Sequence, residues 1–145
     1  MRKICVIIAA MMILAAFATA SCAFWGKGDK AGLKTFQKCV ELFNTAMRWG
    51  DYQAASELVF PLKKQQFWSL AELIKKSVRI TEVTVRDASV SKTETTGTAI
   101  VTVQYYRLNS AVLKDAVIRE EWVFSPEEKV WRIRDAGSND IEEIN

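Results

Sequence analysis

The chain of 145 residues contains no histidine. Without an imidazole it cannot build a Ser-His-Asp or Cys-His nucleophile, a histidine general base or a histidine-ligated zinc site. Glycine is scarce as well, with six residues, and neither a P-loop nor a G-x-G-x-x-G phosphate cradle is present. We therefore expect no metal, no cofactor and no enzyme of these types.

The N-terminus carries the clearest signal in the chain. Arg2 and Lys3 precede the apolar run "ICVIIAAMMILAAF" (4–17), and small residues follow up to Cys22. This order is typical of a secretory signal peptide, because the run is shorter than the roughly 20 apolar residues of a transmembrane helix. We expect residues 1–21 to be removed, which lowers the formal net charge from +3 to +1. A chain so near neutrality is not expected to bind nucleic acid.

Cysteine is also rare, with three residues, and Cys5 leaves with the signal peptide. Cys22 and Cys39 are therefore the only pair that could form a disulfide. Cys39, however, follows Phe36 by three residues and precedes Phe43 by four, on or beside an apolar helical stripe. A small buried thiol is the simpler interpretation of Cys39.

The residues "TASC" (19–22) resemble the lipobox of bacterial lipoprotein signals, although the family prefers leucine where this chain has Thr19. The resemblance implies an acylated Cys22, a lipid anchor in a membrane, and a place in the bacterial cell envelope, periplasmic or on the outer surface. Residues 22–32 would then be the lipidated cysteine and a flexible tether. The alternative is cleavage after Ala20 at an A-x-A site, which would give a secreted soluble chain.

Hydrophobic spacing predicts three helices followed by four strands. Apolar residues three and four apart predict a helix over 31–49, ended by Gly50, and Asp51 is a good N-cap for a second helix over 52–60, before Pro61. A third helix is expected over 62–77. Alternating β-branched residues predict strands over 78–90 (with a bulge or bend near Glu82-Val83), 98–108, 112–124 and 130–135. The polar, acidic tail of residues 136–145 follows.

This order is an α+β layout, with three N-terminal helices packed on a strongly curved four-stranded antiparallel sheet. The segments "RWGDYQAASEL" (48–58) and "EEWVFSPEEKVWRIRD" (120–135) resemble the nuclear-transport-factor-two-like superfamily, a cystatin-like cone that includes ketosteroid isomerases and polyketide cyclases. The likeness covers residues 33–135. It implies a cone-shaped domain and a homodimer through the exposed sheet face. Enzymes of the superfamily often use Asp-His or Tyr-Asp sets, and the first is impossible here.

Glu120 is the polar residue that raises a functional question. It shares its strand parity with Ile118, Trp122 and Phe124, so an inward Glu120 would be costly to ionise and its pKa would rise. A bulge or strand end could turn it to solvent instead, and the pattern favours that orientation because fully buried glutamate is rare. Tyr105 or Tyr106, but not both, can face inward. Glu120 with Tyr105 is the candidate catalytic pair.

Aromatic side chains could line the mouth of the cone, although aromatics at helical spacing more often belong to the core. The candidate pocket residues are Trp49, Tyr52, Phe67, Trp68, Tyr105, Glu120 and Trp122. Charged residues alternate with the apolar ones on the last two strands and therefore share the opposite face of the sheet. We expect this face to be solvated, with a partner surface as the alternative. The residues are Arg119, Glu121, Arg132 and Arg134.

Three functions follow from these observations. The first is a noncatalytic, lipid-anchored envelope domain that binds a small apolar ligand or a protein partner. The second is an isomerase- or dehydratase-like enzyme that uses Glu120 and a tyrosine. The third is a structural homodimeric module of the envelope. A closed apolar pocket with a few convergent polar groups would favour the first two.

Overall fold

The structure, a computed structural model, describes residues 32–137. The expected signal peptide, Cys22 and the tether up to residue 31 lie outside the described residues, as does the tail from residue 138. Three α-helices, α1 (Leu33–Trp49), α2 (Tyr52–Glu57) and α3 (Lys64–Ser77), precede four strands, β1 (Val78–Val90), β2 (Thr96–Arg107), β3 (Leu113–Ser125) and β4 (Val130–Asp135). The expected α+β class is confirmed. No described helix is long and apolar enough to cross a membrane.

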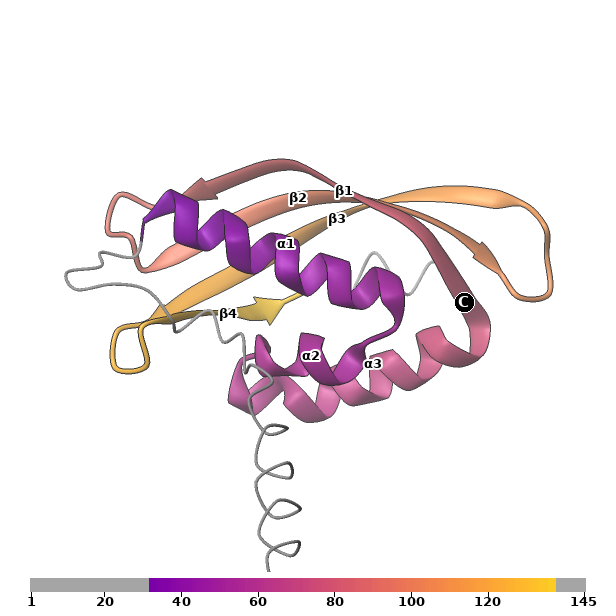
Figure 1. Ribbon diagram of the computed structural model, residues 1–145, viewed down its shortest axis with the longest axis horizontal. Coiled ribbons are helices and arrows are strands. Elements are labelled where there is room, and N and C mark those ends of the chain that lie inside the picture. Colours follow the sequence, from indigo (N-terminus) through magenta and orange to yellow (C-terminus); the bar gives the residue numbers. More distant parts are fainter. Residues whose placement is uncertain (1–31, 138–145) are drawn as a thin grey trace, which may run out of the picture.

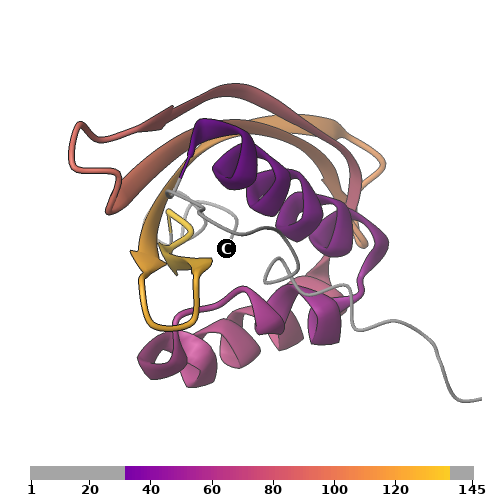
Figure 2. The ribbon, with the colours of Figure 1, turned by 60° about the vertical axis from the view of Figure 1, so that its left-hand side comes forward.

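The four strands form one antiparallel sheet in the order β1-β2-β3-β4. The sheet curves over α1, and α2 and α3 lie across its open side (Figures 1 and 2). The pairing of β1 with β2 shifts register between Ile80 and Glu82 and again between Val85 and Asp87. Irregular pairing increases local bending, and the first shift adjoins the bulge expected near Glu82-Val83.

The connection between α1 and α2 follows the sequence signals. Gly50 ends α1 at a φ of 72°, in the left-handed region that glycine adopts without steric cost. The Asp51 carboxylate then accepts a hydrogen bond from the Ala54 N–H at 3.0 Å, as an N-cap does. Both residues thus act as expected.

The expected end of the second helix at Phe60 is wrong, because α2 ends at Glu57. The residues beyond it run along β4 instead. Ile133 N–H donates to the Leu58 carbonyl at 2.7 Å, and Phe60 N–H donates to the Ile133 carbonyl at 2.8 Å. Strand-like pairing with β4 therefore takes the place of the last helical turn, and Pro61 opens the short 3-10 helix η2 (Pro61–Lys63) before α3.

The core lies between α1 and the inner face of the sheet. Phe36 is fully buried, and its ring centroid is 4.9 Å from that of Trp131 and 6.0 Å from that of Trp122. Cys39 is fully buried in the same cluster, as expected for a packed thiol. A Cβ atom at Gly97 would lie 2.7 Å from the Phe36 ring, so β2 needs glycine here for α1 to pack this closely.

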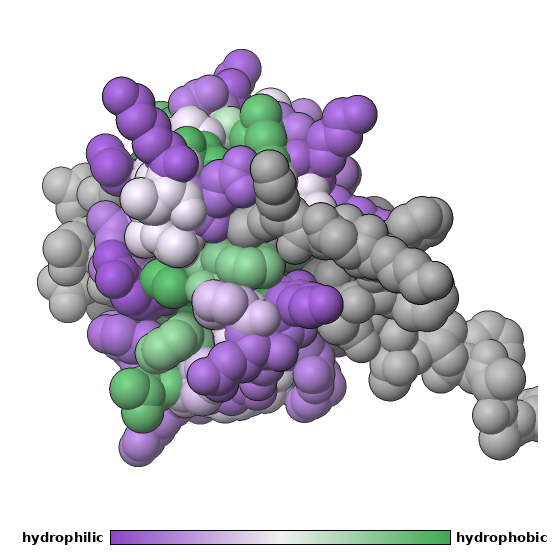
Figure 3. Space-filling view, turned by 90° about the vertical axis from the view of Figure 1, so that its left-hand side faces the viewer, coloured by the Kyte–Doolittle hydropathy of each residue, from purple (hydrophilic) through white to green (hydrophobic). Residues whose placement is uncertain are grey.

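The charged strand face is largely paired. Arg134 and Glu121 join β4 to β3 at 2.9 Å, whereas Arg132 binds Glu128 at 2.7 Å and donates to the Glu57 carbonyl. The end of the molecule that bears the β1–β2 and β3–β4 turns is mainly hydrophilic, with separate small apolar areas (Figure 3). This is the surface expected of a solvated domain end.

Candidate functional site

Glu120 points into the cone, so the prediction that its side chain turns out to solvent is wrong. Its side chain is 2% exposed. The pairing of β3 with β2 runs from Leu113 to Val123 without a register shift, so no bulge turns Glu120 outward. The irregularity in the pairing of β3 with β4 falls between Glu121 and Trp122, beyond Glu120.

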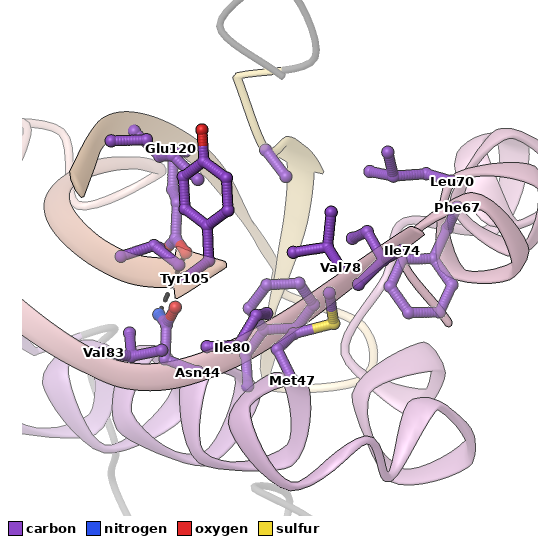
Figure 4. A pocket seen from close by; sticks show the side chains of 15 residues that line it. Asn44, Met47, Phe67, Leu70, Ile74, Val78, Ile80, Val83, Tyr105 and Glu120 are labelled. Atoms are coloured by element: carbon purple, nitrogen blue, oxygen red, sulfur yellow. Dashed lines mark hydrogen bonds between the residues drawn. The ribbon is translucent and has the colours of Figure 1, made fainter. Parts of the chain in front are cut away.

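Two donors hold the Glu120 carboxylate. The Asn44 amide donates to Oε1 at 2.9 Å, and the Trp122 indole donates to Oε2 at 3.0 Å. Figure 4 shows the Asn44 contact across the gap between α1 and the sheet. Asn44 Nδ2 also donates to the Val40 carbonyl at 3.0 Å, which orients the amide. Each carboxylate oxygen thus accepts one hydrogen bond from the protein.

Asn44 is the site residue that the sequence reasoning missed. It is 6% exposed and lies one position after the buried Phe43, on the apolar flank of α1. A lone amide on such a flank requires a buried partner, because a buried polar group without one is costly. That requirement was the available signal.

Burial raises the pKa of Glu120 from 4.5 to about 7. The hydrogen bonds from Asn44 and Trp122 act in the opposite direction, because they stabilise the ionised carboxylate. Burial is the larger effect, so Glu120 carries both protonation states near neutral pH. A carboxyl group of this kind can accept or release a proton at physiological pH.

A half-open cavity of about 60 Å³ lies beside Glu120. A water molecule needs about 10–15 Å³ by the same measure, so the space holds several waters or a small apolar group. The lining is almost entirely apolar and comes from α1, α3, the first three strands and the residue after β4. Its members are Phe43, Asn44, Met47, Phe67, Leu70, Ile74, Val78, Ile80, Val83, Val103, Tyr105, Ala116, Ile118, Glu120 and Ala136 (Figure 4).

No protein-family model and no curated protein matches this chain. Solved structures do. A ketosteroid isomerase-like protein from Erwinia carotovora atroseptica aligns at a TM-score of 0.56 and 12% identity, over 70% of this chain and 89% of its own. A candidate polyketide cyclase from Xanthomonas campestris pv. campestris aligns at a TM-score of 0.51 and 11% identity, over 78% of this chain and 98% of its own. The chain has the nuclear-transport-factor-two-like fold.

A third solved structure widens the range of proteins that share this cone. A SEC-C motif-containing protein from Rhodopseudomonas palustris aligns at a TM-score of 0.54 and 13% identity, over 72% of this chain and 77% of its own. At such identities the likeness concerns the nuclear-transport-factor-two-like fold alone. The site must therefore be interpreted from its own residues.

The cone gathers some of the expected pocket residues and excludes others. Phe67, Tyr105 and Glu120 line the cavity, and Trp122 lies behind Glu120 in the core. Tyr52 packs against the cluster that borders the cavity. Burial raises the pKa of its hydroxyl, and the nearby Arg79 charge offsets part of this rise.

Trp49 and Trp68 do not line the cavity, contrary to the expectation. Trp49 is the last residue of α1 and is 75% exposed, with the Arg48 guanidinium 5.3 Å from its ring centre. Trp68 is 37% exposed, and its ring forms a T-shaped contact with that of Phe67, which does line the cavity. Successive residues on a helix point in different directions, so only one of the pair can face inward.

Tyr105 faces inward and is 6% exposed, as the alternation with Tyr106 allows. It lines the same cavity as Glu120, but no hydrogen bond joins the two among the described residues. No cluster of three or more metal-ligating side chains occurs within residues 32–137 either. Glu120 and Tyr105 therefore share a pocket without forming a bonded acid–base pair.

Proposed function

We propose that this domain is a noncatalytic binding module that holds a small, mostly apolar molecule in the cavity. The observation that carries the proposal is an apolar lining with few polar groups, since only Asn44, Tyr105 and Glu120 among its residues carry polar side chains. Ligand sites of small molecules have this composition, with a few polar groups that set orientation. The names of the ketosteroid isomerase-like and polyketide cyclase structures agree with a small-molecule pocket in this fold.

The noncatalytic assignment rests on how Glu120 is held. Both of its oxygens already accept hydrogen bonds from Asn44 and Trp122, and no second acid–base side chain contacts it among the described residues. Acid–base chemistry on a bound molecule also needs a second polar group aligned with Glu120 to stabilise the developing charge, and covalent catalysis needs an activated nucleophile. A ligand that bears one hydroxyl or amine donor can still share the free lone pairs of the carboxylate.

Phenol and benzene are suitable probes of the cavity. We expect phenol to shift the methyl NMR signals of Ile74 and Ile118 in a saturable manner, and to bind more tightly than benzene because its hydroxyl can donate to Glu120. Ala116→Leu fills the cavity and should abolish these shifts. The control is Ala54→Leu, which makes the same chemical change at an exposed position on α2, outside the cavity. Equal phenol affinity in both variants would contradict the proposal.

The second candidate function is an isomerase- or dehydratase-like enzyme. It is favoured by the pKa of Glu120, which lies at about 7 beside Tyr105 in an apolar cavity. A base that abstracts a proton next to a carbonyl would exchange the α-protons of cyclohexanone in D₂O. Exchange faster than in buffer, and lost in Glu120→Gln, would support the enzyme. If the domain only binds ligands, the exchange rate of cyclohexanone should equal that in buffer alone.

We further propose that the domain is exported and anchored through acyl chains on Cys22. The support is the signal-peptide order of residues 1–21 and the lipobox-like "TASC". Several acyl chains hold a protein on a membrane stably, whereas a single chain binds only weakly. Intact mass spectrometry of protein extracted from membranes should show a chain that begins at Cys22 with an added diacylglyceryl mass. A soluble chain that begins at Ser21 would refute the anchor.

A further inference from the structure

In the part of the chain that the structure describes, the β3 strand has a long edge without a neighbouring strand. β4 pairs with β3 only over Glu121–Ser125. After β4 the chain turns, because Gly137 has a φ of 62° and its N–H binds the Asp135 carboxylate at 3.0 Å. Within residues 32–137, Leu113–Arg119 therefore has β2 on one side and no strand on the other.

This edge is suited to pairing with another strand. The opposite edge of the sheet, β1, is broken by two register shifts, a common device against edge-to-edge association. The β3 edge keeps an unbroken register with β2 over its whole length. It also carries exposed apolar side chains, since Leu113 is 53% and Val117 61% exposed.

The apolar exposure continues around the turn between β2 and β3. Leu108 is 48% exposed and Val112 59% exposed. In Figure 1 this end of the hairpin projects beyond the helices, at the right of the view. Open backbone groups beside grouped apolar side chains mark an association surface more often than a solvated one.

We propose that this edge pairs with the same edge of a second copy of the chain. The two β3 strands run antiparallel about a two-fold axis at Val117, so that two four-stranded sheets become one continuous sheet. On the outer face each Asp115 then lies opposite Arg119 of the other copy, on either side of the two Val117 side chains.

Charge selects this register. The exposed charges on the outer face of this edge are Asp115 and Arg119, and the axis at Val117 sets each of them opposite the other. A two-fold axis at Ile118 would place Asp115 of one copy opposite Glu121 of the other, which is a repulsive pair. An axis at Ala116 would place every charged residue of Leu113–Arg119 opposite an apolar residue. An axis at Asp115 would place the two copies of Asp115 opposite each other, and an axis at Arg119 would do the same for Arg119, so like charges would meet. Opposite charges across strands stabilise a pair and like charges destabilise it.

The contact is isologous, as in most homodimers, because the same residues face each other from both copies. It differs from association through the exposed sheet face, which would stack two sheets instead of extending one. The two arrangements place different residues near the two-fold axis, so site-specific cross-linking distinguishes them.

Cysteine cross-linking of the full chain, purified in a non-ionic detergent, tests the register. The Cβ atoms of two opposed residues are about 5 Å apart, so Val117→Cys should form a disulfide-linked dimer on mild oxidation. Leu113→Cys is the control, because its two copies would be about 26 Å apart along the strands and should give no dimer above that of the unsubstituted chain. A dimer from Leu113→Cys alone, or from neither variant, would overturn the proposal.

Charge reversal tests the Asp115–Arg119 pairs without a new thiol. Arg119→Asp should raise the dimer dissociation constant about tenfold, measured by sedimentation velocity, because two attractive pairs become repulsive. The double variant with Asp115→Arg and Arg119→Asp restores opposite charges and should recover the original constant. Both residues are exposed, so the fold tolerates the changes. A monomeric native chain, or a double variant as weak as the single one, would overturn the proposal.

Discussion

Glu120→Gln is expected to remove a pH dependence of about 3 kcal/mol from the free energy of unfolding. In the native chain burial raises the pKa of Glu120 from 4.5 to about 7. Below pH 4.5 the carboxyl is protonated in both the folded and the unfolded state. Between pH 4.5 and about 7 the folded state keeps the proton that the unfolded state releases. The native chain therefore loses stability as the pH rises through this window, and the loss is complete above it.

The measurement is chemical unfolding of the native chain and of Glu120→Gln at several pH values from 4 to 9. The difference in unfolding free energy between the two proteins should change by about 3 kcal/mol across the window, in favour of the variant at high pH. Glu121→Gln is the matched control, because the neighbouring carboxylate lies on the other face and pairs with Arg134 at the surface. Parallel pH profiles for the native chain and Glu120→Gln would contradict the assigned burial effect.

Trp131→Ala should lower the free energy of unfolding by about 3–5 kcal/mol. The Trp131 ring is fully buried, with Phe36 at 4.9 Å and Phe124 at 5.4 Å between ring centres. Its indole N–H has no hydrogen-bond partner among the described residues. The loss is therefore one of packing alone, from the cavity that the substitution leaves between α1 and the sheet.

Trp49→Ala makes the same chemical change at an exposed position and serves as the control. Trp49 is 75% exposed and contacts the Arg48 guanidinium, so its removal should cost less than about 1 kcal/mol. Denaturant unfolding at one pH gives both values. Similar losses in the two variants would mean that the Trp131 environment is not the packed core described above.

The order and type of the elements could be predicted from the sequence, because each depends on short-range chemistry. Apolar spacing, Gly50 and Asp51 place α1 and the start of α2, and alternating β-branched residues give β1 and β4 their bounds. The end of α2 could not be predicted in this way. Leu58 and Phe60 bond to Ile133, far away in the sequence, and such long-range pairing leaves no periodicity in the local segment.

The candidate site was predictable only in part. Strand parity places Glu120 with Ile118 and Trp122 on the apolar face, but the sequence does not say whether a bulge or a strand end turns its side chain out to solvent. The rarity of buried glutamate favours the wrong face, because that general rule takes no account of the two donors that Asn44 and Trp122 supply. Asn44 and Glu120 are 76 positions apart, so their contact exists only once α1 lies across the sheet.

The sequence by itself determined the fold class, the absence of any histidine chemistry and the signal-like N-terminus, since these follow from composition and from spacing within a few residues. The tertiary structure decided that Glu120 is buried, that Asn44 and Trp122 bind it, and that Trp49 and Trp68 lie outside the cavity. Among residues 32–137 it also leaves the β3 edge without a neighbouring strand where β4 ends. The assignment of "ASCAFWGKGDK" (20–30) as anchor and tether stays a prediction from the sequence, because these residues lie outside the described part of the chain. The physical reason for the division is range: local patterns fix the elements, whereas burial and pairing depend on which elements meet.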